Sequence, residues 1–279
     1  MFHEKTLLPR SYVKSAARLF FLMMAGLMIG TVPAYAAIRT ETVEYRDRDA
    51  VLEGYLAYND DSQTRMPGVL IIHEWTGLGP YVEKRAEQIA SLGYVAFAAD
   101  IYGKGIRPSD PKDAAAQSAI YKKDRALMRE RAMAGLKILQ TDPLVDPSRI
   151  AVIGYCFGGT TALELARSGA DLRGAVSCHG GLDTPEPGDA KNIKAKVLVL
   201  HGADDPHVPA KDLEAFENEM RDAGVDWQVV LYGGAVHSFT NPTAGSDPSK
   251  GNAYDAKADA RSWEAMRSFL NEVFTSQGG

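Results

Sequence analysis

The residues best suited to chemistry in this chain lie in the hexapeptide Gly154-Tyr155-Cys156-Phe157-Gly158-Gly159. An apolar run over 150–153 precedes it and a helix-like run over 161–166 follows it, so the pattern predicts a strand, a sharp turn and a helix. The glycines two before and two after Cys156 fit such a turn, because a Cβ atom there would collide with the neighbouring backbone. The spacing favours Cys156 as an exposed nucleophile, and the simpler interpretation is a small buried core residue.

A nucleophile of this kind needs a base and an acid, and the chain supplies both in the expected order. Asp204 and Asp205 follow an apolar strand ending at His201, and His237 follows another ending at Tyr232. The imidazole of His237 would take the thiol proton, and a carboxylate would hold its tautomer. We favour Asp205 as the acid because it begins a D-x-x-V-P segment, a common form of the loop that carries the catalytic acid. Asp204 is more typical of a turn residue.

The transition state also needs donors for its oxyanion. We assign these to the backbone N–H groups of Phe157, directly after the nucleophile, and of Trp75, in the loop after the first parallel strand. No set of His, Asp and Cys residues has the spacing of zinc ligands. The sharp turn at Cys156, called the elbow below, lacks the G-x-G-x-x-G and G-K-[ST] patterns of nucleotide-binding loops. We therefore expect neither metal nor cofactor, and we expect structural or solvated roles for His179, His201 and His207.

The order of the predicted elements specifies an α/β fold. A hairpin is expected over 42–58, followed by buried strands at 68–74, 94–100, 150–153, 174–178, 195–201 and 226–232. Helices are expected at 80–92, over 112–139 in two pieces, and at 211–223 and 258–274. This alternation implies a mostly parallel central sheet with an N-terminal antiparallel hairpin and helices on both faces. The candidate residues all follow strands, at the carboxyl edge where such sheets hold their sites.

The first 36 residues predict a secretory signal peptide. Four basic residues in the first 18 positions precede an apolar run over 19–32, and an A-x-A site ends at Ala36. We expect cleavage after Ala36 and an exported protein, periplasmic or secreted, with an uncleaved anchor or a transit peptide as alternatives. Residues 37–279 then form a single domain.

The composition limits the partners. The formal net charge is −5, and without the first 36 residues, which hold four basic side chains and one acidic, it is −8. An acidic surface argues against nucleic acid and against stable membrane association after signal cleavage, and leaves a small molecule as the partner of a monomer or small homo-oligomer. Cys156 and Cys178 are the only cysteines, so a disulfide between them is an alternative to two free thiols.

With these motifs in place, the chain resembles the dienelactone hydrolase (carboxymethylenebutenolidase) family of the α/β-hydrolase superfamily. The resemblance rests on G-Y-C-F-G-G, on H-E-W after the first parallel strand, on H-G-A-D-D-P-H-V-P and on H-S-F. It implies an α/β-hydrolase fold and cofactor-independent hydrolysis of a lactone or related small ester through a thioester. It also implies that Glu74 contacts the resting thiol and helps to generate the thiolate, whereas the plain interpretation of Glu74 is an ion-paired loop residue.

The resemblance further suggests where a substrate carboxylate would bind. The family's arginine follows a D-x-Y segment, which is Asp100-Ile101-Tyr102 here, and Lys104 stands near that position with Arg107 three residues further. Ser238 matches a second family position. Lysine offers a point charge and not a bidentate fork, so the substrate could differ. Alternatives are a general carboxylesterase, thioesterase or peptidase, or a non-hydrolytic thiol sensor or binding protein on the same scaffold.

Overall fold

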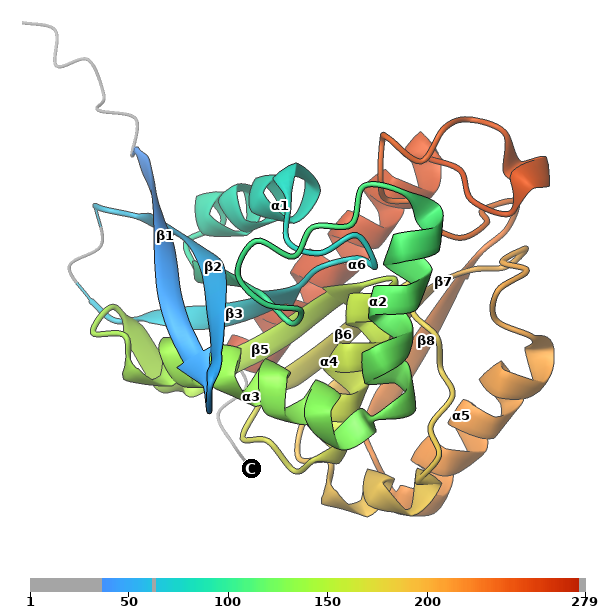
Figure 1. Cartoon of the computed structure of the whole chain (residues 1–279). Helices are drawn as coiled ribbons and strands as arrows, with labels where there is room; N and C mark the ends of the chain where they lie inside the picture. The colour runs from blue at the N-terminus through green and yellow to red at the C-terminus, as the bar shows by residue number, and fades with distance from the viewer. Residues whose placement is uncertain (1–36, 62–63, 276–279) are drawn as a thin grey trace, which may run out of the picture. The chain divides into compact units, whose positions relative to one another are not determined.

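The computed structural model describes residues 37–61 and 64–275, and the predicted signal peptide lies outside the described residues (Figure 1). Their centre is one sheet of eight strands in the order β1-β2-β4-β3-β5-β6-β7-β8. The strands are β1 (Ile38–Asp47), β2 (Ala50–Asn59), β3 (Met66–Ile72), β4 (Val95–Ala99), β5 (Val145–Tyr155), β6 (Gly174–Cys178), β7 (Lys196–Gly202) and β8 (Trp227–Tyr232).

The sheet is antiparallel at one edge and parallel elsewhere. β1 and β2 form the predicted hairpin, β2 pairs antiparallel with β4, and all the remaining neighbours pair in parallel. The parallel strands read as continuous apolar runs because both of their faces are buried. The predicted α/β-hydrolase architecture is confirmed.

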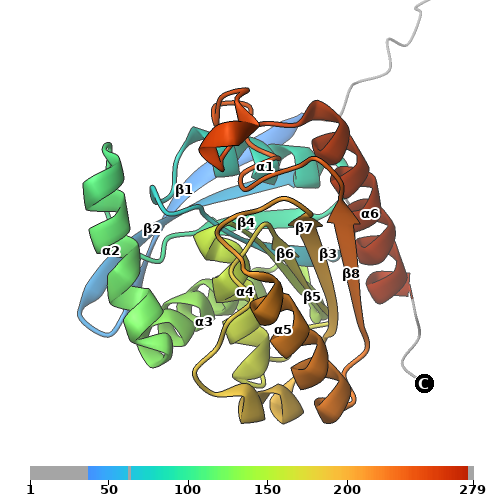
Figure 2. The same cartoon turned by 90° about the vertical axis from the view of Figure 1, so that its right-hand side faces the viewer.

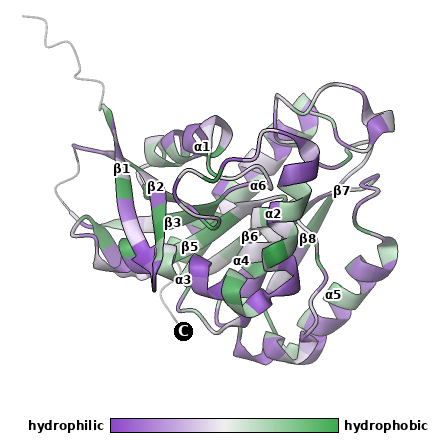
Figure 3. Cartoon of the chain, in the orientation of Figure 1, coloured by the Kyte–Doolittle hydropathy of each residue, from purple (hydrophilic) through white to green (hydrophobic). Residues whose placement is uncertain are grey.

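Helices cover both faces of the sheet (Figure 2). One face packs against α1 (Pro80–Ser91) and α6 (Ala256–Thr275), and the other against α3 (Arg125–Thr141), α4 (Phe157–Arg167) and α5 (Ala210–Ala223). Alternate residues of β3 divide between the two cores, Val69 to the first and Leu70 to the second. The hydropathy colours follow this division, with apolar residues along the inner strands and polar residues on the outer helices (Figure 3).

The helical region after β4 is broken in two, as predicted. α2 (Pro111–Lys123) ends at Asp124, and the Asp124 side chain then accepts a hydrogen bond from Leu127 N (2.9 Å) and caps α3. Two short 3₁₀ helices, Pro187–Asn192 and Pro248–Lys250, lie in the loops after β6 and β8. Within 37–61 and 64–275, no helix has the length and apolar character needed to span a membrane.

Candidate active site

Cys156 occupies the sharp turn between β5 and α4. Its backbone has φ 55° and ψ −116°, a conformation that a residue with a side chain rarely adopts. The glycines around it are required by contact: a Cβ atom on Gly154 would lie 1.8 Å from the Gly158 carbonyl oxygen, and one on Gly158 would lie 2.2 Å from that of Ile72. The strained turn therefore depends on glycine at both positions, for the steric reason predicted from the sequence.

Three side chains from three different loops meet at this turn. The Cys156 Sγ lies 3.0 Å from Nε2 of His237, and His237 Nδ1 lies 2.8 Å from Oδ2 of Asp205. The other carboxylate oxygen of Asp205 accepts the backbone N–H of His207 (2.8 Å). Both cysteines are free thiols, with Cys178 buried in β6. The structure thus brings together the predicted nucleophile, base and acid, and it aligns Asp205 with His237.

The surroundings favour a protonated His237 imidazole beside the sulfur. Burial lowers the pKa of His237, but the Cys156 sulfur and the Asp205 carboxylate outweigh it and raise that pKa to about 10. Burial raises the pKa of Asp205, yet its hydrogen bond to His237 and the charge of that ring hold the pKa below the ordinary value. Proton transfer from the sulfur to a ring already oriented by a carboxylate is the chemistry that this arrangement permits.

The two predicted oxyanion donors lie in the turn that carries Cys156 and in the loop after β3. The N–H of Phe157 opens α4, and Trp75 lies in the loop after β3. Among the described residues, neither N–H donates a hydrogen bond to the protein. The Tyr102 hydroxyl donates to the Trp75 carbonyl (2.9 Å), which fixes the peptide next to this N–H.

A buried histidine beneath that loop adds a second anchor. His73 Nδ1 lies 2.6 Å from the Glu74 carbonyl oxygen, and its Nε2 accepts the Ile101 N–H at 3.1 Å. Burial lowers the pKa of His73 to about 4, so the ring is neutral and donates through Nδ1. The sequence pattern H-E-W did not reveal this anchoring role.

Glu74 lies beside the site and has a different partner from the one that the family resemblance implies. Its carboxylate is buried, and Oε2 accepts a hydrogen bond from Asn241 Nδ2 (2.6 Å). Burial raises its pKa above the ordinary value, partly offset by the Asn241 amide and by His237. In the part of the chain that is described, Glu74 makes no hydrogen bond to Cys156 Sγ, because the sulfur faces His237.

The predicted carboxylate-binding cations lie in different places. Lys104 Nζ is 2.7 Å from Glu44 and 3.5 Å from Glu53, so its charge is paired at the β1–β2 hairpin. Arg107 donates to the carbonyls of Ile106 (2.9 Å) and Gly103 (3.2 Å), and its guanidinium lies 3.6 Å from the buried carboxylate of Asp100.

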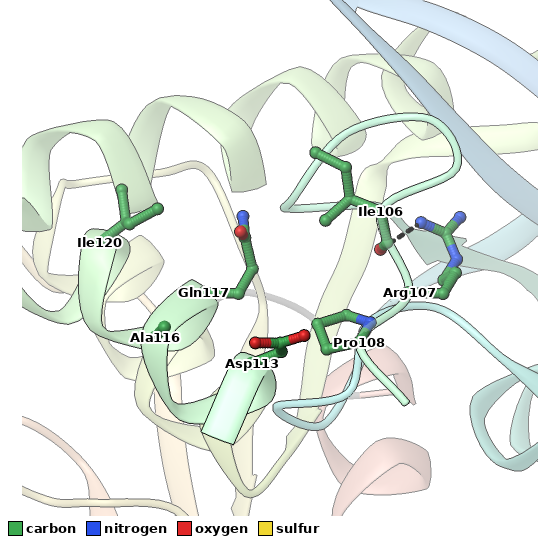
Figure 4. Close-up of a pocket in the computed structure, with 7 residues that line it drawn as sticks. All are labelled: Ile106, Arg107, Pro108, Asp113, Ala116, Gln117 and Ile120. Carbon is green, nitrogen blue, oxygen red and sulfur yellow. Dashed lines mark hydrogen bonds between the residues drawn. The ribbon is translucent and has the colours of Figure 1, made fainter. Parts of the chain in front are cut away.

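Arg107 lies much closer to the predicted oxyanion loop. A Cβ atom on Gly77, two residues after Trp75, would be 3.2 Å from Arg107 Cδ. Arg107 also borders a cavity of about 410 Å³ whose other lining residues are Ile106, Pro108, Asp113, Ala116, Gln117 and Ile120 (Figure 4). The third candidate, Ser238, follows His237 with φ 58° and is half-buried.

Sequence reasoning missed the residues that connect these parts. Thr240 and Asn241 follow His237 closely and contact His179 and Glu74, respectively. His179 had been assigned only a structural or solvated role, yet its ring lies 5.3 Å from that of His237. The only indication in the sequence was that hydrogen-bonding residues directly follow His237. Their partners could not be identified because they lie far away in the sequence.

Comparison with known proteins identifies the family. The model of the dienelactone hydrolase family matches residues 52–274. The chain belongs to this family. The structure "m3DLH" is 42% identical, with a TM-score of 0.83, over 86% of this chain and 100% of that one. A "Dienelactone Hydrolase-like" promiscuous phosphotriesterase from metagenomic libraries is 43% identical, with a TM-score of 0.81, over 85% and 99%.

One curated relative is named as a lactonase. The "Probable 2-oxo-3-(5-oxofuran-2-ylidene)propanoate lactonase" of Bradyrhizobium sp is 27% identical over 184 residues, covering 63% of this chain and 74% of that protein. By its family, the chain is a lactone or ester hydrolase that acts on small molecules.

Proposed function

We propose that this hydrolase cleaves small carboxylic esters or lactones through a Cys156–His237–Asp205 triad and a thioester acyl-enzyme. The observation that carries the proposal is the line from sulfur to imidazole to carboxylate, with separations of 3.0 Å and 2.8 Å. The chemistry uses the chain's own side chains and backbone, and needs no cofactor.

The steps follow from the positions of these atoms. His237 Nε2 takes the thiol proton, and Sγ attacks the carbonyl carbon, whose oxygen becomes an oxyanion facing the N–H groups of Phe157 and Trp75. The tetrahedral intermediate collapses by breaking the bond to the alkoxide, which receives the proton from Nε2. A water molecule then gives a proton to Nε2 and attacks the thioester, and the acid product leaves as the thiol is restored.

Glu74 makes no hydrogen bond to the resting thiol, and we propose it as an auxiliary proton acceptor only when substrate binding turns the sulfur away from His237. Its pKa is raised by burial, which brings a carboxylate closer to the range in which it accepts protons near neutral pH. The Asn241 amide fixes one of its oxygens and leaves the other for a proton.

For substrates that carry a carboxylate, we assign the cationic contact to Arg107 in place of Lys104, with Ser238 as a second contact. Arg107 packs against the loop that carries Trp75, whereas Lys104 is held at the β1–β2 hairpin by Glu44. A guanidinium also suits the planar fork of a carboxylate.

We retain export as a proposal, supported by the basic, apolar and A-x-A pattern of residues 1–36. When the full sequence is expressed in a Gram-negative host, the protein should be recovered outside the cytoplasm with Ala37 as its first residue. A chain found in the cytoplasm with residues 1–36 attached would contradict the proposal. The molar mass of the same sample, measured by light scattering, tests whether the protein is a monomer or a small homo-oligomer.

Pre-steady-state kinetics with excess substrate test the chemistry. With an activated aryl ester, we expect a burst of aryl alcohol equal to the enzyme concentration, and intact-protein mass spectrometry should show the acyl group on Cys156. Cys156→Ala and His237→Ala should remove the burst, and Cys178→Ala, at a buried thiol away from the base, should keep it. Undiminished turnover in Cys156→Ala would refute the triad.

A substrate panel then separates the rival activities. Lactones, aryl esters, thioesters and peptide amides distinguish a lactonase from a general esterase, thioesterase or peptidase. An aryl phosphotriester belongs in the panel, because one similar structure is named for that activity. Full alkylation of Cys156 by iodoacetamide without hydrolysis of any member would favour a thiol sensor.

A further inference from the structure

A buried imidazole lies directly behind the nucleophile. His179, the residue after β6, has no exposed surface and a backbone φ of 42°. Its Nδ1 lies 3.2 Å from the backbone nitrogen of Cys156, which also donates to the Cys178 carbonyl (3.0 Å). The N–H of the nucleophile is therefore shared between a carbonyl and an aromatic nitrogen, and its direction depends on both.

The other side of the same ring is held by the segment that carries the base. His179 Nε2 lies 2.7 Å from Thr240 Oγ1, and the Tyr81 hydroxyl lies 2.6 Å from the same oxygen. Arg85 fixes this segment by donating to the Thr240 carbonyl (2.7 Å). The ring also packs edge-on against those of His237 and Phe239, at centroid separations of 5.3 Å and 5.2 Å.

These contacts determine where the proton of His179 resides. An N–H points at Nδ1, so Nδ1 must be the unprotonated nitrogen that accepts it, and the single proton lies on Nε2 and is donated to Thr240. Burial holds the pKa of His179 well below its ordinary value, and the charges of His237, Arg85 and His201 lower it further. A second proton on the His179 ring would remove the Nδ1 acceptor of the Cys156 N–H and place a cation beside the His237 imidazolium.

We propose that His179 is a positioning residue that fixes the Cys156 backbone N–H and presents an uncharged face to His237, with its tautomer set by that N–H and its Nε2 proton held by Thr240. The consequence for catalysis rests on the triad function proposed above. Cys156 N–H and the oxyanion donor Phe157 N–H belong to successive peptides, so a rotation at the strained elbow would misdirect both. Displacement of reacting groups by about 1 Å can cost a factor on the order of 10² in rate.

Paired substitutions test this role. His179→Asn keeps an acceptor near Nδ1 and tolerates positive φ, whereas His179→Leu removes the acceptor. Thr240→Ser keeps the hydroxyl, and Thr240→Val removes it. We expect kcat to fall about tenfold to a hundredfold in the Leu and Val variants with little change in KM, and to stay near wild type in the Asn and Ser variants. Equal kcat values within each pair, at equal melting temperature, would overturn the proposal.

An activity-independent measurement keeps the two proposals separable. In the wild-type chain with ¹⁵N-labelled histidine, the His179 ring, identified by its absence from the His179→Asn spectrum, should stay neutral with the proton on Nε2 from pH 5 to 9. A protonated ring, or a proton on Nδ1, would overturn the inference even in an active enzyme. If no ester is hydrolysed but the ring shows this tautomer, the triad proposal fails while the hydrogen-bond assignment holds.

Discussion

Replacing Asp205 by asparagine changes one atom and should misdirect the base. Asp205 accepts two hydrogen bonds, from the backbone N–H of His207 through Oδ1 and at Nδ1 of His237 through Oδ2, both at 2.8 Å. An asparagine has a single acceptor oxygen. If it keeps the His207 contact, its NH₂ group faces Nδ1 of His237, and if it turns over, its NH₂ group faces the backbone N–H.

The backbone donor cannot change, whereas an imidazole can change tautomer, so the first arrangement should prevail. His237 then carries its proton on Nε2 and points it at the Cys156 sulfur, where it can no longer accept the thiol proton. The corresponding change in a serine triad lowers kcat by about 10⁴. A cysteine is partly ionised without help, so we expect kcat to fall here by a factor of about 10²–10⁴, equivalent to about 2.7–5.4 kcal/mol of barrier.

The assay is steady-state hydrolysis of an aryl ester, with Asp204→Asn as the matched control. Asp204 is the exposed neighbour in the same loop, so its variant should retain wild-type turnover. Melting temperatures of both variants check that the loop still folds. Retention of more than about a tenth of the activity in Asp205→Asn, or a large loss in Asp204→Asn, would refute the tautomer argument.

Three further outcomes follow from the same geometry. Gly158→Ala should lower the unfolding free energy, measured with urea, by at least about 4 kcal/mol, because the new Cβ atom would lie 2.2 Å from a backbone oxygen. The control Gly188→Ala, whose new Cβ atom would meet nothing within 4 Å, should change the unfolding free energy by less than about 0.5 kcal/mol. Arg107→Ala should raise the KM for a carboxylate-bearing ester about tenfold and leave the KM for a neutral ester unchanged. Lys104→Ala should change neither KM value. Equal effects of Arg107→Ala on the two esters would exclude the contact between Arg107 and the substrate carboxylate. The pKa of His237 is raised to about 10, so its stabilising contribution is complete below the ordinary value of 6.5 and disappears as the pH rises through about 10. The difference in unfolding free energy between wild type and His237→Gln should therefore shrink over that pH range, and a difference that grows would contradict the raised pKa.

The sequence was most informative where a local pattern has a local physical cause. The elbow was predictable because Gly154 and Gly158 are required by backbone contacts within one turn. The strands were predictable because parallel strands buried on both faces are continuous apolar runs. Chain order then brought Asp205 and His237 to the correct edge of the sheet, and the Asp205 side chain is the one that meets the imidazole.

Side-chain partners distant in the sequence could not be predicted in the same way. Lys104 was placed by its distance from a D-x-Y segment, but acidic residues of the β1–β2 hairpin neutralise it. Glu74 was expected to contact the thiol, and its partner is Asn241, 167 residues later. Such pairs depend on how loops from separate strands pack together, which periodicity and spacing do not encode.

The turn from His237 to Asn241 combines roles that the sequence motif H-S-F only partly suggests. Within five residues it holds the proposed base, the Thr240 hydroxyl that contacts His179 behind the nucleophile, and the Asn241 amide that contacts Glu74. The turn is closed by a hydrogen bond from Asn241 N to the Ser238 carbonyl (2.9 Å). A shift of this turn would therefore move the base, the support of the Cys156 N–H and the auxiliary carboxylate together. Substitutions here should show coupled effects in double-mutant cycles, unlike substitutions at Lys104, which lies on another loop.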